Sequence, residues 1–401
     1  MAGFVGGTGT SYPVAGTQLG LALETVRGTL ESAPAYMFPV REPKYEPMQA
    51  YIPDQTLQGS AVKTYDEVLG MRYDKHGWSS YPYLDSFPLL VIGELGSTDT
   101  LVTAIAATTL SSAATAGAST VSLTGTVAAG DWITFGTYPT LETHLVKSVT
   151  GAGPYVATLA DPVVFAQASG AAVTGLTGHK MSLLNTGQMQ PPSLSLWDND
   201  NEQWRTMTAC QLDELTIKGN ATGMVESTVT LLGNPAVNNA TAPSVSYTGT
   251  RAPAPWTFGF QLGGTQLTTV EDWEISFKRS TKEVPAVTGT QEYFQYFADV
   301  LDVSGKLTFV EQSGSPYLAN YLNGTEESID FTIFDMKAGG ALNIHSTEAF
   351  FTVGSLERGS EYVKVPITFD PMPTSTDALA GGVSPVLVQV ANSVTTQYWA
   401  G

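Results

Sequence analysis

The sequence contains few charged residues, and most of those are acidic. Asp, Glu, Lys and Arg together make up 14% of the 401 residues, against roughly 25% in an ordinary globular domain. The 37 acidic residues outnumber the 18 basic ones, which gives a net charge of −19. Clusters of Lys and Arg that could neutralise phosphates are missing, which argues against stable binding to nucleic acid. A surface with so little charge is typical of a subunit that buries several faces in an assembly.

Cysteine and long apolar runs are scarce as well. Cys210 is the only cysteine, so a disulfide within the chain is excluded, and we expect a buried, inert thiol. No stretch of 18 apolar residues occurs, so no membrane-spanning helix is predicted. Residues 1–16 lack the basic and apolar regions of a secretory signal. We therefore expect a protein that stays soluble in a reducing cytoplasm until it assembles.

Sequence motifs of enzymes are not found. The four histidines (His76, His144, His179 and His345) lie far from one another and from Cys210, so no local metal or redox motif exists. The chain has no Gly-x-Ser-x-Gly elbow and no phosphate loop ending in Gly-Lys-Ser/Thr. We predict that the protein is not an enzyme and has no catalytic, cofactor-binding or metal-binding residues. For His76 we expect a half-exposed structural role on a strand.

Two groups of acidic residues are weak candidates for a site. Residues 198–202 could offer oxygen ligands to Ca²⁺, but the run lacks the mid-loop glycine and the distal glutamate of such loops, so a solvated hairpin tip is preferred. Adjacent carboxylates on a strand point to opposite faces, so no such pair alone supplies the two acids of a glycosidase. These pairs are Asp213-Glu214, Glu271-Asp272 and Glu326-Glu327.

The abundant residues favour strands joined by tight turns. Alternation is clearest in residues 272–278, where Trp273, Ile275 and Phe277 point one way and polar residues the other. One buried and one polar face per strand is typical of a sandwich, or of a barrel with a wet side. Further strands are expected at residues 18–26, 35–40, 58–64, 71–79, 307–309, 329–333 and 363–369.

Residues 86–96 predict the one convincing helix. Ser86 can cap it, Pro88 falls in its first turn, and Gly96 closes it. The helix is apolar nearly all round, so it must be buried. A second short helix is expected at residues 315–322. One main helix among many strands predicts an antiparallel β protein with a helix laid over one edge or face.

The length of the chain predicts two domains. Charge almost vanishes between residues 108 and 178, where Ala, Gly, Thr and Val dominate, so we expect an inserted surface β domain there. The core domain would then be discontinuous, formed by residues 18–107 and 179–372. Residues 1–17 are expected to form a flexible N-terminal arm, and residues 41–60 a long exposed connection. Residues 373–401 are expected to form a C-terminal linker and arm, whose lone strand at 386–391 invites pairing with a neighbouring sheet or subunit.

Several of these segments carry a family resemblance. The strands and aromatic residues that lead into YLDSFPLLVIGELG (residues 83–96) resemble the N-terminal half of major tail proteins of long-tailed bacteriophages, the tail tube subunits. Residues 23–29 and 37–40 are similar to the opening pattern of that family. Residues 315–335 and 359–372 resemble its late helix-then-strand and its closing strand. The resemblance covers residues 20–95 and 180–372.

The resemblance implies a tail-tube-type β-sandwich or barrel core with one or two short flanking helices. It implies hexameric rings that stack into a non-contractile tail tube in the virion, with tape measure, tail terminator and tip proteins as further partners. Double-stranded DNA would pass through without stable binding, and the net charge of −19 suits an electronegative bore that repels phosphates. Deleting residues 41–60 or 386–401 is expected to leave a folded subunit that cannot polymerise.

Two other virion or surface functions compete with this one. A β-sandwich carbohydrate-binding or adhesion protein could use residues 108–178 as its binder and stack sugars on loop aromatics. Those aromatics are Tyr12, Tyr36, Tyr51, Tyr81, Tyr83 and Tyr155. A capsid shell or decoration protein keeps the virion context, but a shell subunit usually has a long helix, which the sequence does not predict.

Overall fold

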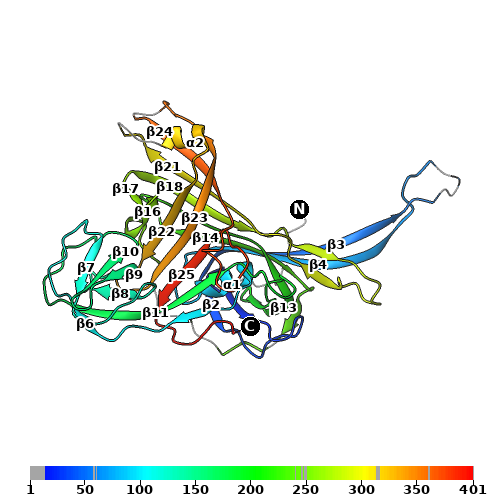
Figure 1. Cartoon of the computed structure of the whole chain (residues 1–401). Coiled ribbons are helices and arrows are strands. Elements are labelled where there is room, and N and C mark those ends of the chain that lie inside the picture. The colour runs from blue at the N-terminus through cyan, green and yellow to red at the C-terminus, as the bar shows by residue number, and fades with distance from the viewer. Residues whose placement is uncertain are drawn as a thin grey trace, which may run out of the picture.

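The structure is a computed structural model that describes residues 14–56, 59, 61–239, 241–244, 247, 251–312, 317–359 and 362–400. Most of the arm predicted at residues 1–17 lies outside these residues. Figure 1 shows a body of packed antiparallel sheets with a long hairpin, β3–β4, projecting from one side and a small β module on the other. No helix within the described residues is long and apolar enough to cross a membrane.

Strands dominate the described residues. The helices are α1 (Phe87–Leu95) and α2 (Tyr317–Asn323), and the 3-10 turns are η1 (Val14–Gly16) and η2 (Pro255–Thr257). The strands in chain order are β1 (Gln18–Leu23), β2 (Tyr36–Phe38), β3 (Val40–Asp54), β4 (Asp66–Ser80), β5 (Thr100–Val102), β6 (Thr108–Thr109), β7 (Thr120–Leu123), β8 (Trp132–Phe135), β9 (Glu142–Thr150), β10 (Tyr155–Leu159), β11 (Ala172–Ser182), β12 (Leu194–Asn199), β13 (Trp204–Asn220), β14 (Glu226–Gly233), β15 (Val237–Asn239), β16 (Gly259–Leu262), β17 (Thr265–Leu267), β18 (Val270–Lys278), β19 (Lys282–Val284), β20 (Gln295–Phe297), β21 (Asp302–Val310), β22 (Glu327–Phe334), β23 (Ala341–Gly354), β24 (Lys364–Pro371) and β25 (Leu387–Asn392).

The backbone of the body is an antiparallel ladder in the order β3-β4-β14-β13-β18-β21-β24-β23. Its register aligns Ile217 with Ile275, and Leu307 with Ile367, so apolar side chains of neighbouring strands meet on one face. Trp273, Ile275 and Phe277 are buried there, as their alternation predicted. The opposite face is polar. A second layer, built from β1, β2, β12, β25, β11, β22 and β16, joins the ladder and completes the core.

Helix α1 fills the space between the layers, and every one of its residues is buried. It packs on β13, β11 and β1. Gly93 lets it approach β13, because a Cβ there would collide with Leu212. Gly96 has φ 81° and donates its N–H to the Ile92 carbonyl, which ends the helix as predicted. Ser86 is the N-cap residue, as predicted, but its side chain makes no cap hydrogen bond. The second short helix is α2, and the predicted mainly β class with a sandwich or barrel core and short helices is confirmed.

Residues 41–60 do not form the expected loop. Most of them belong to β3, which pairs with β4 over its whole length. Pro43, Pro47 and Pro53 lie in this segment, and proline disfavours a strand because it lacks the N–H that the ladder needs. Among the described residues β3 pairs with β4 alone, so a missing N–H can face outward without breaking the ladder. Two bulges, between Arg41 and Lys44 and between Gln49 and Tyr51, take up the irregular register. The strand expected at residues 58–64 is absent from the described part of that segment.

The strand of the expected C-terminal arm pairs with a sheet of its own subunit, which is the first of the two expected partners, so a free arm at residues 386–391 is wrong. β25 lies inside the subunit, between β11 and β23. Val388 and Val390 are fully buried, because their alternation completes the same core that the longer strands form. The residues after β25 are held as well, since the Tyr398 hydroxyl donates to the Asp85 carbonyl at 2.5 Å. A neighbouring subunit is therefore not needed to pair this strand.

Residues between β6 and the first half of β11 enclose a separate apolar cluster around Leu123, Ile133, Phe135 and Val173. β11 runs without interruption from this module into the body, where it pairs with β25. The module contacts the body through both apolar and charged side chains. Trp132 packs against Phe334, Ala341 and Ala391, and Lys147 forms an ion pair with Asp330 at 2.9 Å.

The burial of β25 generates a stability prediction. Replacing Val390 with Asp places a carboxylate between β11 and β23, where it has no partner, so we expect the free energy of unfolding to fall by about 3 kcal/mol or more. Val383→Asp is the matched control, since Val383 is 43% exposed and should tolerate the charge. Urea denaturation followed by circular dichroism measures both. Equal stability of the two variants would contradict the assignment of β25 to the core of one subunit.

Candidate functional site

The outer half of the β3–β4 hairpin is the most unusual surface of the molecule. Its strands extend away from the body, and beyond Arg72, which bridges to Glu292, no other described strand pairs with them (Figure 1). Tyr51 lies opposite Leu69, and Ile52 lies opposite Val68. All four side chains are more than half exposed. Because successive residues of a strand point to opposite faces, the first pair covers one face of the hairpin and the second pair the other.

Such a hairpin is not stable through its own contacts. Two strands without a third strand or a packed layer are marginal in water. Cross-strand apolar pairs on both faces leave each pair in contact with solvent, and Met48 is also exposed on β3. We refer to Met48, Tyr51, Ile52, Val68 and Leu69 as the hairpin patch. A patch on both faces needs cover from both sides, which this subunit does not provide.

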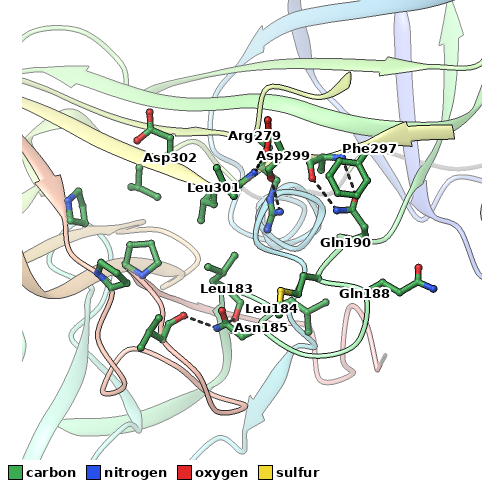
Figure 2. Close-up of a pocket in the computed structure, with 18 of the residues that line it drawn as sticks. Leu183, Leu184, Asn185, Gln188, Gln190, Arg279, Phe297, Asp299, Leu301 and Asp302 are labelled. Carbon is green, nitrogen blue, oxygen red and sulfur yellow. Dashed lines mark hydrogen bonds between the residues drawn. The ribbon is translucent and has the colours of Figure 1, made fainter. Parts of the chain in front are cut away.

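A groove of about 610 Å³ lies elsewhere on the body, below the end of α1 (Figure 2). Its walls come from the segment after β11, the segment between β20 and β21, and the loops after β24. The groove is mostly apolar, and Met189, Phe297 and Val300 are exposed on it. Gln190 fixes one wall by exchanging two hydrogen bonds with the backbone of Ala298, both 2.9 Å long.

Arg279 lines the groove and holds the C-terminus of α1. Its guanidinium donates to the carbonyls of Glu94 at 2.6 Å and Leu95 at 3.3 Å, which satisfies helix-end acceptors. The Glu94 carboxyl is fully buried, and neither oxygen accepts a hydrogen bond from a described residue. Burial raises the pKa of Glu94 to about 8, and the nearby positive charge of Arg279 only partly opposes this. The carboxyl is therefore mostly neutral at pH 7.

The histidines form separate buried contacts. His144 lies between Asp161 at 2.9 Å and Glu142 at 3.0 Å. Burial alone would lower the pKa of His144, but these two carboxylates outweigh it and raise the pKa to about 10. His179 contacts Asp99 at 2.7 Å. These pairs join neighbouring strands and loops and leave no open position for a substrate.

The other two histidines are also structural. His345 contacts Asp330 at 2.9 Å; burial works against its charged form, but this carboxylate raises the pKa of His345. His76 is buried, so its expected half-exposed position is wrong. It shares the inner face of β4 with Trp78, two residues on, and contacts that ring edge-on.

The weak candidates from the sequence do not converge. Residues 198–202 cover the end of β12 and the turn toward β13, where Asp200 pairs with Arg205 at 2.5 Å. No group of three or more His, Cys, Asp or Glu side chains among the described residues could hold a metal ion. Cys210 is buried, and that burial raises the pKa of its thiol. Glu271 pairs with Lys364 rather than with a second carboxylate.

The tyrosines proposed to stack sugars are scattered. Tyr36 is half-buried on β2 against Tyr398, Tyr51 is exposed on β3, and Tyr155 lies on β10 of the module. Tyr81 and Tyr83 contact each other just before α1, and Tyr12 lies outside the described residues. No shared platform results among those described. The hairpin patch was not predicted from the sequence. The available signal was the β-branched and aromatic residues on both sides of Gly59-Ser60 in the sequence.

An antiparallel β subunit that leaves apolar surfaces uncovered and brings no catalytic groups together has the features of a self-associating structural protein. The sequence model of the phage tail tube protein family matches residues 91–371. This range runs from α1 through β24 and covers more than half of the chain, so the chain belongs to the phage tail tube protein family. It is thus a structural tail protein of the virion and not an enzyme. No curated protein matches the sequence.

Glu94 generates a pH prediction. Below pH 4.5 the carboxyl is protonated in both the folded and the unfolded chain, so it does not affect stability. Between pH 4.5 and about 8 only the unfolded chain ionises, and the folded state loses stability as pH rises. Glu94→Gln removes this loss. We expect the variant to match the wild type at pH 4 and to exceed it by a few kcal/mol at pH 8.5.

Guanidinium denaturation at the two pH values measures this difference. Glu202→Gln, an exposed glutamate in a turn, is the control and should follow the wild type. A Glu94→Gln variant whose stability changes with pH as the wild type does would show that Glu94 is already ionised in the fold.

Proposed function

We propose that this subunit polymerises as stacked hexameric rings into the tail tube of a long-tailed phage and that the tube conducts double-stranded DNA. The observation that carries the proposal is the hairpin patch. Full burial of each large apolar side chain contributes about 1.5–3 kcal/mol. Five such side chains at the end of a projecting arm give a subunit a strong tendency to bind a neighbour.

The groove offers a second apolar surface of a different shape. Contact between two different surfaces of identical subunits is head-to-tail, and it produces closed rings or continuous stacks. A projecting hairpin and a concave groove on one chain suit such a contact. Tube formation would also cover the free edge of β3, which is otherwise open to aggregation.

The division of the chain supports the same function. We propose a discontinuous core domain of residues 18–107 and 179–372, completed by β25, with residues 108–178 as an inserted surface domain. The separate apolar cluster of the module, and its place on the side of the body away from the hairpin, favour a position on the outside of the tube (Figure 1). Whether that domain binds a host-surface ligand is a separate question from tube formation.

Further partners follow from the family resemblance. Tape measure, tail terminator and tip proteins would contact the tube along its bore and at its ends, and assembly would take place in the host cytoplasm before the virion forms. The net charge of −19 supports an electronegative conduit in which DNA is repelled rather than held. The proposal that the tube is non-contractile rests on the family resemblance.

The hairpin patch can be tested directly. We expect Tyr51→Ser with Leu69→Ser to leave a folded monomer that forms no tubes, because one apolar face of the hairpin is lost. Val26→Ser with Tyr138→Ser is the control, since both residues are exposed on loops of the body and module. Sedimentation velocity and negative-stain electron microscopy compare the three proteins. Normal tubes from the hairpin variant would contradict the proposal.

A further inference from the structure

The polar face of the central ladder has an ordered arrangement of charges. It is formed by the outward residues of β14, β13, β18, β21 and β24. Ser and Thr occupy its middle, where Thr216 lies beside Thr228 on one side and Ser276 on the other. The opposite face of the same strands is buried in the core. A broad wet face of this kind suits the wall of an aqueous channel.

Carboxylates flank the basic residues on this face. Lys218 lies 3.9 Å from Glu226. Glu226 also binds Arg41 at 2.5 Å, across the intervening strand β4 from β3. Lys306 lies 3.8 Å from Glu274 across the β18–β21 pair. The Lys218–Glu226 and Lys306–Glu274 contacts join side chains on adjacent strands, so the antiparallel register sets them.

The same arrangement continues to both sides. Lys364 on β24 lies 2.7 Å from Glu271, at the bulge of β18. Lys278 is flanked by Glu214 on β13 and Asp302 on β21. Each of these basic residues therefore has a carboxylate within contact distance or at the paired position of an adjacent strand.

These ion pairs are partly exposed, so they add little to stability. Exposed pairs contribute about 0–1 kcal/mol each. Their larger effect is on the field above the sheet, because a free lysine attracts phosphate and a paired one does so much less. Glu226, Glu271 and Glu274 are the carboxylates that contact Arg41, Lys218, Lys306 and Lys364. Without them, these four cations would be free to attract the phosphates of DNA.

We propose that this face lines the bore and that Glu226, Glu271 and Glu274 neutralise its basic side chains, so that DNA slides over them without binding. The inference rests on the proposed tube function and adds to it the residues that prevent adhesion. The negative net charge of the chain is then not sufficient for DNA passage. Local pairing of the cations is also required.

The test is the triple variant Glu226→Gln, Glu271→Gln and Glu274→Gln. The control is Glu202→Gln, Glu292→Gln and Glu326→Gln, which changes the net charge equally at exposed residues outside these strands. Binding of a fluorescein-labelled 20-base-pair duplex is measured by anisotropy on the subunit and on tubes at several salt concentrations. Circular dichroism checks folding, and electron microscopy scores tubes.

We expect the face variant to bind at least about ten-fold more tightly than wild type at low salt. Four freed cations should give a slope near −3 to −4 in log affinity against log salt, since each contributes about 0.9. Equal affinities of the face variant and the control, or no binding by either, would overturn the inference. Failure of the wild type to form tubes would instead count against the proposed function, while the subunit assay would still decide this point.

Discussion

An antiparallel sheet needs cover for its edges and its apolar side chains, and this requirement governs the whole subunit. The body meets it internally. β25 fills the position between β11 and β23, and α1 lies between the layers with all its residues buried. The ladder ends at β3, where the chain continues outward as a two-stranded hairpin with apolar pairs on both faces. We infer that the edge and apolar side chains of this hairpin are covered only when subunits assemble.

Local patterns predicted the parts of the fold that depend on local contacts. Gly96 ends α1 because only a residue that tolerates a positive φ fits there. Alternation placed Trp273, Ile275 and Phe277 on the buried face of β18. The position of a strand in the sheet is not a local property. The prolines of β3 are tolerated because β3 is an edge strand. β25 is central because β11, far earlier in the sequence, and β23 leave a space between them.

The candidate surfaces were less accessible to sequence reasoning for the same reason. Composition established that acidic residues outnumber basic ones, and this predicts an electronegative bore for the proposed tube. Which carboxylate meets which lysine depends on the register between strands that are distant in sequence, as with Lys364 and Glu271. His76 was expected to be half-exposed on a strand, but it faces inward with Trp78. The family resemblance therefore indicated the function, and the structure located the hairpin patch and the polar ladder face on which the proposals rest.

Hydrogen–deuterium exchange of the subunit and of assembled tubes tests the central claim most directly. The claim is that the outer half of β3–β4 finds its cover only in the assembly. It predicts fast exchange of the amides of residues 48–54 and 66–71 in the subunit and strong protection in the tube, while β13 exchanges slowly in both. Equal exchange of the hairpin amides in subunit and tube would contradict the account.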